Sequence, residues 1–115
     1  MSVTLDLVTF DSPDTDRLAD FWSAALGLRE VEREDGNRWI VLADGRCRIG
    51  IQRGEHRAGS LHLDLACPPE EFTTELDRLI ACGATALSAP RHEPYGSIVN
   101  LADPDGNPFD LCAYD

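Results

Sequence analysis

Hydrophobic and polar residues alternate along several short stretches of the chain. From Val3 to Phe10 the leucines share one face, and Asp6 stands on the other. From Ser60 to Cys67 leucines again share one face, with His62 and Asp64 opposite them. Alternation with period two is typical of a strand with one buried face. Each stretch is therefore predicted to be a half-buried β-strand.

Two other stretches follow the helical period. A first helix is predicted between Ser12-Pro13, which supply an N-cap and a first-turn proline, and Gly27, which ends it. A second is predicted between Pro68-Pro69 and Gly83, with acidic residues in its first turn. Both carry an apolar stripe that can face a sheet.

The order of elements then repeats. Three short strands are predicted after each helix, at about residues 28–33, 38–43 and 47–53 and at about 85–88, 97–101 and 108–113. We therefore predict one α+β domain over residues 1–115, made of two modules, 1–55 and 60–115, each with one strand, one helix and three strands. A helix covers one face of an antiparallel sheet, so the two uncovered faces could form a cup.

The last predicted strand follows a strong turn signal. Residues 103–107 read Asp-Pro-Asp-Gly-Asn, in which proline presets φ, the second aspartate bonds its own backbone, and glycine accepts positive φ. In the strand that follows, Phe109 and Leu111 share one face and Asp110 stands on the other. Asp110 is therefore predicted to be the fixed point of a small-molecule site.

Charge and composition narrow the class of protein. The formal net charge is -11, which repels nucleic acid and anionic lipid and favours cationic ligands over anionic ones. The chain has no apolar run near eighteen residues and no signal-peptide pattern, so we expect a soluble, cytoplasmic protein that contacts neither nucleic acid nor membrane. The four cysteines lack the spacing of a zinc site and are expected to be reduced thiols.

Polar residues on the predicted inner faces form a candidate metal site. The first and last strands of the two modules contribute Asp6, Gln52, His62 and Asp110. Two carboxylates, an imidazole and an amide suit a divalent ion such as Mn, Fe, Ni or Zn. The alternative is that these side chains are simply the solvated polar face of a sheet.

Aromatic and titratable residues elsewhere are candidates for substrate binding. His92 and Tyr95 lie in a predicted loop that could line the mouth of the cup, although an ordinary surface loop is equally compatible with the pattern. Trp39 alternates with apolar neighbours and could point into the cup or into the core.

Four segments resemble the vicinal oxygen chelate superfamily of glyoxalase I, extradiol dioxygenases and bleomycin-resistance proteins. They are Asp20-Phe21-Trp22, Ala25-Leu26-Gly27-Leu28, the strand at 61–65, and the segment 103–109. The resemblance covers nearly the whole chain and is nearest to short glyoxalase-like bacterial members. It implies two βαβββ modules that form an incomplete mixed barrel around a cleft, and a homodimer.

The resemblance also implies the positions of metal ligands. Metal-using members take ligands from the first and last strands of each module, and these positions look like Asp6, Gln52, His62 and Asp110. A single histidine in this set argues against the two-histidine iron site of the dioxygenases. The lack of basic residues on the inner face argues against glyoxalase I activity, which binds glutathione.

Two functions follow as hypotheses. The first is a lyase or isomerase in which a divalent ion chelates adjacent oxygens of a substrate and stabilises an enolate, with Asp110 as the catalytic carboxylate. The second is a metal-free protein that sequesters a small, cationic drug or metabolite beside Trp39 and Tyr95, as bleomycin-resistance members do.

Overall fold

The structure of the chain is a computed structural model that describes residues 5–58 and 62–115. The chain divides into two compact units, Met1–His56 (unit 1) and Arg57–Asp115 (unit 2). Within the described residues, each unit has one α-helix and one mixed sheet, and neither sheet closes into a barrel. The predicted α+β class is confirmed. Residues 3–4 and 60–61 of the predicted strands lie outside the described residues.

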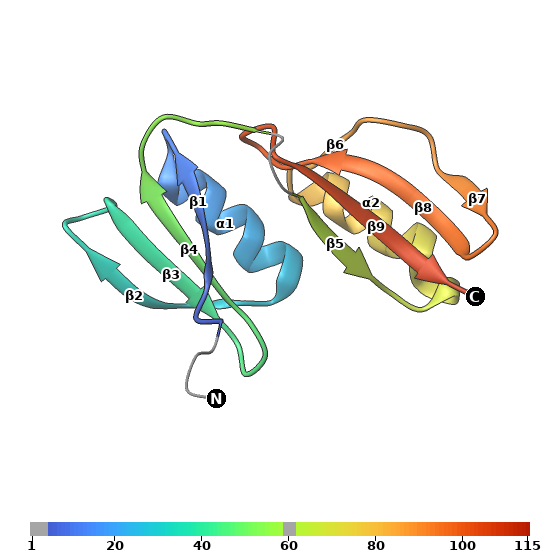
Figure 1. The fold of residues 1–115 in the computed structure, drawn as a ribbon, viewed down its shortest axis with the longest axis horizontal. Helices are drawn as coiled ribbons and strands as arrows, with labels where there is room; N and C mark the ends of the chain where they lie inside the picture. The colour runs from blue at the N-terminus through green and yellow to red at the C-terminus, as the bar shows by residue number, and fades with distance from the viewer. Residues whose placement is uncertain (1–4, 59–61) are drawn as a thin grey trace. The chain divides into compact units, whose positions relative to one another are not determined.

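Unit 1 is a four-stranded sheet with a helix along one face (Figure 1). The strand order is β1-β4-β3-β2, in which β1 runs parallel to β4 and the other pairs are antiparallel. Its elements are β1 (Val8–Ser12), α1 (Thr15–Leu26), β2 (Arg29–Glu34), β3 (Trp39–Ala43) and β4 (Arg48–Arg53).

The first strand and first helix begin later than predicted. The hydroxyl of Ser12 accepts a hydrogen bond from the backbone N–H of Asp14 (3.1 Å), so Ser12 closes the end of β1 instead of capping the helix. Asp14 is the N-cap, and its Oδ1 accepts from the backbone N–H of Arg17 (3.2 Å). Asp6 therefore precedes β1 and does not lie within it.

The core of unit 1 forms between α1 and the sheet. Leu18 and Trp22 on α1 are fully buried, and the ring of Trp22 stacks on Phe10 of β1 with centroids 5.8 Å apart. Gly27 ends the helix as predicted, in the left-handed conformation with φ 68° that glycine adopts without steric cost.

Unit 2 is a five-stranded sheet backed by a second helix (Figure 1). The strand order is β5-β9-β8-β6, and β7 also pairs with β8. Its elements are β5 (Leu63–Ala66), a 3₁₀ turn η1 (Pro69–Glu71), α2 (Phe72–Cys82), β6 (Thr85–Ala86), β7 (Arg91–Glu93), β8 (Gly96–Ala102) and β9 (Pro108–Tyr114). The segment predicted as a loop at 92–96 thus begins inside a short strand, whose three residues are too few to show an alternation.

A buried aspartate closes the turn between β8 and β9. The Oδ1 atom of Asp103 accepts hydrogen bonds from the backbone N–H groups of Asp105 and Asn107, both at 2.9 Å, and its Oδ2 accepts from the Asn107 amide at 2.8 Å. The turn was predicted, but the contribution of the Asp103 carboxylate to it was not. Charge-assisted bonds to a side chain only 2% exposed fix the hairpin register, which pairs Asn100 with Asp110.

The two faces of sheet 2 differ in character. Phe109 and Leu111 of β9 and Val99 and Leu101 of β8 are buried on the face toward α2. Asp110 and Asn100 alternate with them, so they lie on the opposite face. Among the described helices, none is both long and apolar enough to cross a membrane.

Candidate functional site

Three potential metal ligands converge on the second face of sheet 2. The Nε2 atom of His62 lies 3.4 Å from Oδ1 of Asp64 and 3.7 Å from Oδ2 of Asp110. One ligand atom from each residue lies within 4.8 Å of the other two. We call these three residues the His62 cluster. Within the described part of the chain, His62 and Asp110 are therefore close together, as the predicted site requires.

Strand pairing positions the cluster. Strand β5 runs parallel to β9, with Asp64 directly beside Asp110 in the register. His62 precedes β5 by one residue and stands two positions before Asp64, which places both side chains on the same side of the chain. The cluster is accessible from solvent: the side chains of His62 and Asp64 are 50% and 59% exposed, and that of Asp110 is 19% exposed.

Asn100 is a member of the site that the sequence prediction missed. Its Nδ2 donates a hydrogen bond of 2.6 Å to Oδ1 of Asp110. Its Oδ1 accepts from Nη1 of Arg91 (2.8 Å) and from Oγ of Ser88 (3.2 Å). The Asp103 turn carries the signal that could have found it, because a hairpin closed over residues 103–107 pairs residue 100 with residue 110.

The donor set suits a divalent cation. Asp64 and Asp110 place two carboxylates side by side, and like charges in that position repel each other unless a cation lies between them. An imidazole nitrogen with carboxylate oxygens is a mixed set that binds Mn, Fe, Ni or Zn. A set of three protein ligands also leaves coordination positions for a substrate, which is the arrangement of catalytic rather than structural metal sites.

Asp6 and Gln52, the two predicted ligands of unit 1, have other contacts. Asp6 is exposed and lies 3.4 Å from the guanidinium of Arg48. Gln52, at the end of β4, donates from Nε2 to Oδ1 of Asp11 on β1 at 2.6 Å. That bond directs the Gln52 carbonyl oxygen away from Asp11. The prediction that these residues bind a metal together with His62 and Asp110 stays a prediction.

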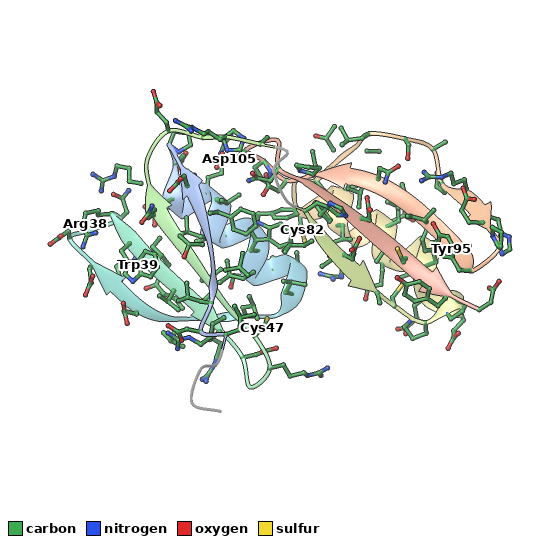
Figure 2. The ribbon with its side chains drawn as sticks, in the orientation of Figure 1. Arg38, Trp39, Cys47, Cys82, Tyr95 and Asp105 are labelled. Carbon is green, nitrogen blue, oxygen red and sulfur yellow. The ribbon has the colours of Figure 1, made fainter. Side chains whose placement is uncertain are left out.

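Trp39 projects from the first residue of β3 in unit 1 (Figure 2). It pairs with Gln52, and its ring lies against Gly50 on the neighbouring strand; a Cβ atom at Gly50 would lie 2.5 Å from the ring. The indole Nε1 donates to a carboxylate oxygen of Glu32 at 2.6 Å. Trp39 is half-buried, and its predicted role in substrate binding stays a prediction.

Tyr95 lies near the C-terminal end of β9 (Figure 2), where its backbone carbonyl accepts a hydrogen bond from the backbone N–H of Asp115 (3.1 Å). The Nε2 atom of His92 is 3.3 Å from a carboxylate oxygen of Asp115. Tyr95 is 46% exposed, and its ring lies 6.1 Å from that of Tyr114, centroid to centroid. The predicted role of His92 and Tyr95 in substrate binding stays a prediction.

The four cysteines have no disulfide partners, and Cys112 is buried. Burial raises the pKa of the Cys67 thiol, with the carboxylates of Glu75 and Glu71 adding to the effect. Burial also raises the pKa of Cys47. A raised pKa keeps a thiol protonated at neutral pH and lowers its reactivity as a nucleophile.

Comparison with known proteins identifies relatives of the chain. Residues 7–112 match the family model of a glyoxalase-like domain. Glyoxalase domain-containing protein 4 of Rattus norvegicus is 29% identical over 117 residues, covering 91% of this chain and 38% of the relative. The chain therefore spans well under half the length of that relative.

Two solved structures share the fold. A glyoxalase/bleomycin resistance protein/dioxygenase family enzyme from Burkholderia phytofirmans PsJN has a TM-score of 0.85 at 21% identity, over 98% of this chain and 100% of that one. A mutant of the fosfomycin resistance protein FosX from Listeria monocytogenes, complexed with Mn(II) and 1S,2S-dihydroxypropylphosphonic acid, has a TM-score of 0.82 at 18% identity, over 100% of this chain and 93% of that one. At these identities the likeness shows a common fold.

Proposed function

We propose that the chain, which belongs to the glyoxalase-like domain family of the vicinal oxygen chelate superfamily, is a metal-dependent lyase or isomerase. Its substrate would be a small molecule with two adjacent oxygens. The ion would be a divalent metal such as Mn, Fe, Ni or Zn, bound at the His62 cluster.

The observation that carries the proposal is the convergence of the cluster. The His62 imidazole lies 3.4 and 3.7 Å from two carboxylates that neighbouring strands place side by side. A structural neighbour of the same fold was complexed with Mn(II), which supports a divalent ion at a site of this kind. The acidic residues match the charge of a divalent cation.

Different residues would act as metal ligand and as proton acceptor. A divalent ion held here would act as a Lewis acid on the neighbouring oxygens of a substrate. Asp110 has one oxygen bound to Asn100, which favours Asp110 as a ligand through its other oxygen. The role of proton acceptor, predicted for Asp110, then passes to Asp64, whose carboxylate is more exposed and can hold the ion with one oxygen and receive a proton on the other.

Metal binding is the first test. Isothermal titration of the full chain, freed of metal by dialysis against chelator, should show one Mn(II), Ni(II) or Zn(II) ion per chain. Asp110→Asn should weaken binding by more than about 100-fold, because it removes a charged ligand. Asp77→Asn on α2 is the matched control, an exposed acid away from the cluster, and should bind like the wild type. A wild type that binds no ion, or an Asp110→Asn variant that binds as tightly, would overturn the site.

Proton transfer is the second test. The metal-loaded chain, incubated with hydroxyacetone in D₂O, should catalyse exchange of the C–H protons on the carbon that carries the hydroxyl group. Proton NMR measures this exchange. Asp64→Asn should abolish the exchange and bind metal more weakly. Full exchange activity in Asp64→Asn would refute its role as proton acceptor.

One observation favours a second candidate function, a metal-free binding protein. The indole of Trp39 is anchored at its edge by Glu32, and Asp11 lies on the same face of sheet 1. An aromatic ring beside carboxylates attracts cations. Because Trp22 is fully buried, a change in tryptophan fluorescence on adding a basic antibiotic in the presence of chelator would report Trp39. Trp39→Phe should remove the change, and the absence of any change in the wild type would exclude this candidate.

A further inference from the structure

We propose that Asn100 is a positioning residue that holds Asp110 in a single-oxygen geometry toward the metal, with its own amide fixed by Arg91 and Ser88. The inference rests on the proposed metal site and extends it to a residue on β8 that touches neither the ion nor the substrate.

The orientation of the Asn100 amide follows from its neighbours. The Arg91 guanidinium can only donate hydrogen bonds, and it lies 2.8 Å from one atom of the Asn100 amide. That atom must therefore be the carbonyl oxygen, which also lies 3.2 Å from the Ser88 hydroxyl. The NH₂ group is left to face Asp110, to which it donates at 2.6 Å. Arg91, which only donates, and the Asp110 carboxylate, which only accepts, thus fix the two ends of the amide together.

The two oxygens of the Asp110 carboxylate therefore have different neighbours. Oδ1 accepts the Asn100 hydrogen bond, and Oδ2 lies 3.7 Å from the His62 imidazole. Rotation of the carboxylate would break the bond to Asn100, so Oδ2 stays directed at the cluster. Because the Asp110 side chain is only 19% exposed, water competes weakly for this bond.

Arg91 is linked to Asp110 by hydrogen bonds through the Asn100 amide. Arg91 also pairs with Glu93 on its own strand, Nε to carboxylate oxygen at 3.0 Å. The guanidinium therefore polarises Asn100 without forming the direct ion pair with Asp110 that would compete with a cation. Groups in this outer position typically change metal affinity by about 10–100-fold when they are removed.

The side-chain amide of Asn100 can be removed by substitution while the backbone hydrogen bonds of the residue are kept. The Asn100 backbone N–H donates to Ser88 (3.1 Å), and its carbonyl accepts from the backbone N–H of Leu87 (2.8 Å). Asn100→Leu keeps both backbone groups and a similar side-chain volume. A purely structural role would therefore change the thermal midpoint and leave the properties of the bound metal unaltered.

Co(II) titration of the full chain, followed by visible absorption, tests the inference. We expect Asn100→Leu to bind Co(II) about 10–100-fold more weakly than wild type. Its spectrum should also change, because a freed carboxylate can bind through both oxygens and raise the coordination number. Asn37→Leu is the matched control: it removes an asparagine-to-aspartate bond of 3.0 Å, to Asp16 in unit 1, and should leave affinity and spectrum unchanged.

Each outcome separates the two proposals. A wild type that binds no Co(II) overturns the metal site and this inference with it. A wild type that binds while Asn100→Leu shows the same affinity and spectrum overturns the inference alone. Should Asn100→Leu fail to fold, Arg91→Met carries the test, since it removes the charged donor that anchors the amide oxygen of Asn100. An affinity and a spectrum unchanged from wild type would then overturn the inference.

Discussion

Each unit has an amide-to-carboxylate hydrogen bond of 2.6 Å beside its parallel strand pair, but the two bonds join different strands and have opposite chemical results. In unit 1, Asp11 on the first strand pairs with Gln52 on the last, and the amide donates to the acid at 2.6 Å. In unit 2 the corresponding pair is Asp64 and Asp110, and the amide that donates at 2.6 Å comes from Asn100 on the next strand. Unit 1 therefore pairs an acid with an amide, whereas unit 2 places two acids together.

The third strand completes the contrast. Trp39 stands beside Gln52 on β3, at the position that Asn100 occupies beside Asp110 on β8. The unit 1 positions thus hold a neutral amide and an aromatic ring, and those of unit 2 hold a carboxylate and the amide that orients it. In both units an aspartate on the first strand faces a residue of the last strand. That residue is Gln52 in unit 1, which gives a hydrogen-bonded polar pair, and Asp110 in unit 2, which gives the proposed cation-binding cluster.

The largest effect that we expect is a difference in stability between two glycine substitutions, one in each unit. Gly96 at the start of β8 has a φ of 140°, and a Cβ there would lie 2.1 Å from the backbone oxygen of Ala113. A Cβ at Gly50 would instead meet the tip of the Trp39 ring at 2.5 Å, and a side chain can move. Gly96→Ala should lower the free energy of unfolding by about 3 kcal/mol, and Gly50→Ala by about 1 kcal/mol.

Intrinsic probes separate the two units in a urea titration. Both tryptophans of the chain lie in unit 1 and both tyrosines lie in unit 2, so tryptophan fluorescence and tyrosine near-ultraviolet circular dichroism report the units individually. Gly96→Ala should move the tyrosine transition to lower urea. Equal destabilisation by the two substitutions would contradict the steric difference between the units.

Gln52 in unit 1 should matter less to metal binding than Asp110 of the His62 cluster. Gln52 offers a neutral carbonyl oxygen, directed by its bond to Asp11, so Gln52→Ala should weaken metal binding by at most about tenfold, or about 1.4 kcal/mol. Titration calorimetry beside Asp110→Asn measures the ratio. A loss from Gln52→Ala as large as that from Asp110→Asn would contradict the assignment of the ion to the His62 cluster.

The smallest expected effect is the acid sensitivity of unit 1. A hydrogen bond from Asn37, with a second from Arg33, holds the pKa of Asp16 below its usual range, and the Arg33 bond does the same for the pKa of Glu30. A folded pKa below the unfolded one contributes stability above the unfolded value, and this stability is lost as the pH falls through the folded value.

Arg33→Met removes the cation that both acids share. The unfolding free energy reported by tryptophan fluorescence should then fall less steeply between about pH 5 and pH 3 than in the wild type. Asp16→Asn should flatten the same limb, since it removes one of the two titrating groups. Parallel pH profiles for Arg33→Met and wild type would show that these pairs do not contribute.

Most of the fold could be predicted from local patterns. The helix ending at Gly27, the β3–β4 hairpin and the turn at 103–107 each rest on residues that act on their immediate neighbours. The start of β1 was misplaced because the alternation continues upstream of the residues that pair with β4. Strand β7 was missed because its pairing with β8 is decided by a partner strand and not by its own sequence. The expected homodimer stays a prediction.

The candidate site was only partly predictable. His62 and Asp110 stood out as polar residues on otherwise apolar strands, and the structure brings them together. Asp64 was predicted on the same strand face as His62 but not among the ligands, because its place beside Asp110 depends on the parallel register of β5 and β9, which no local signal sets. The position of Asn100 beside Asp110 could have been predicted only by extending the strand pairing outward from the turn at Asp103.

Histidine NMR tests the central claim most directly. The chain has three histidines, His56, His62 and His92, whose ring nitrogens can be resolved in a long-range ¹H–¹⁵N spectrum. On titration with Zn(II), the Nε2 resonance of His62 should shift first and saturate at one ion per chain, and Asp110→Asn should greatly weaken this response. A His62 resonance that stays in place while the ion binds elsewhere, or that does not respond at all, would contradict the account.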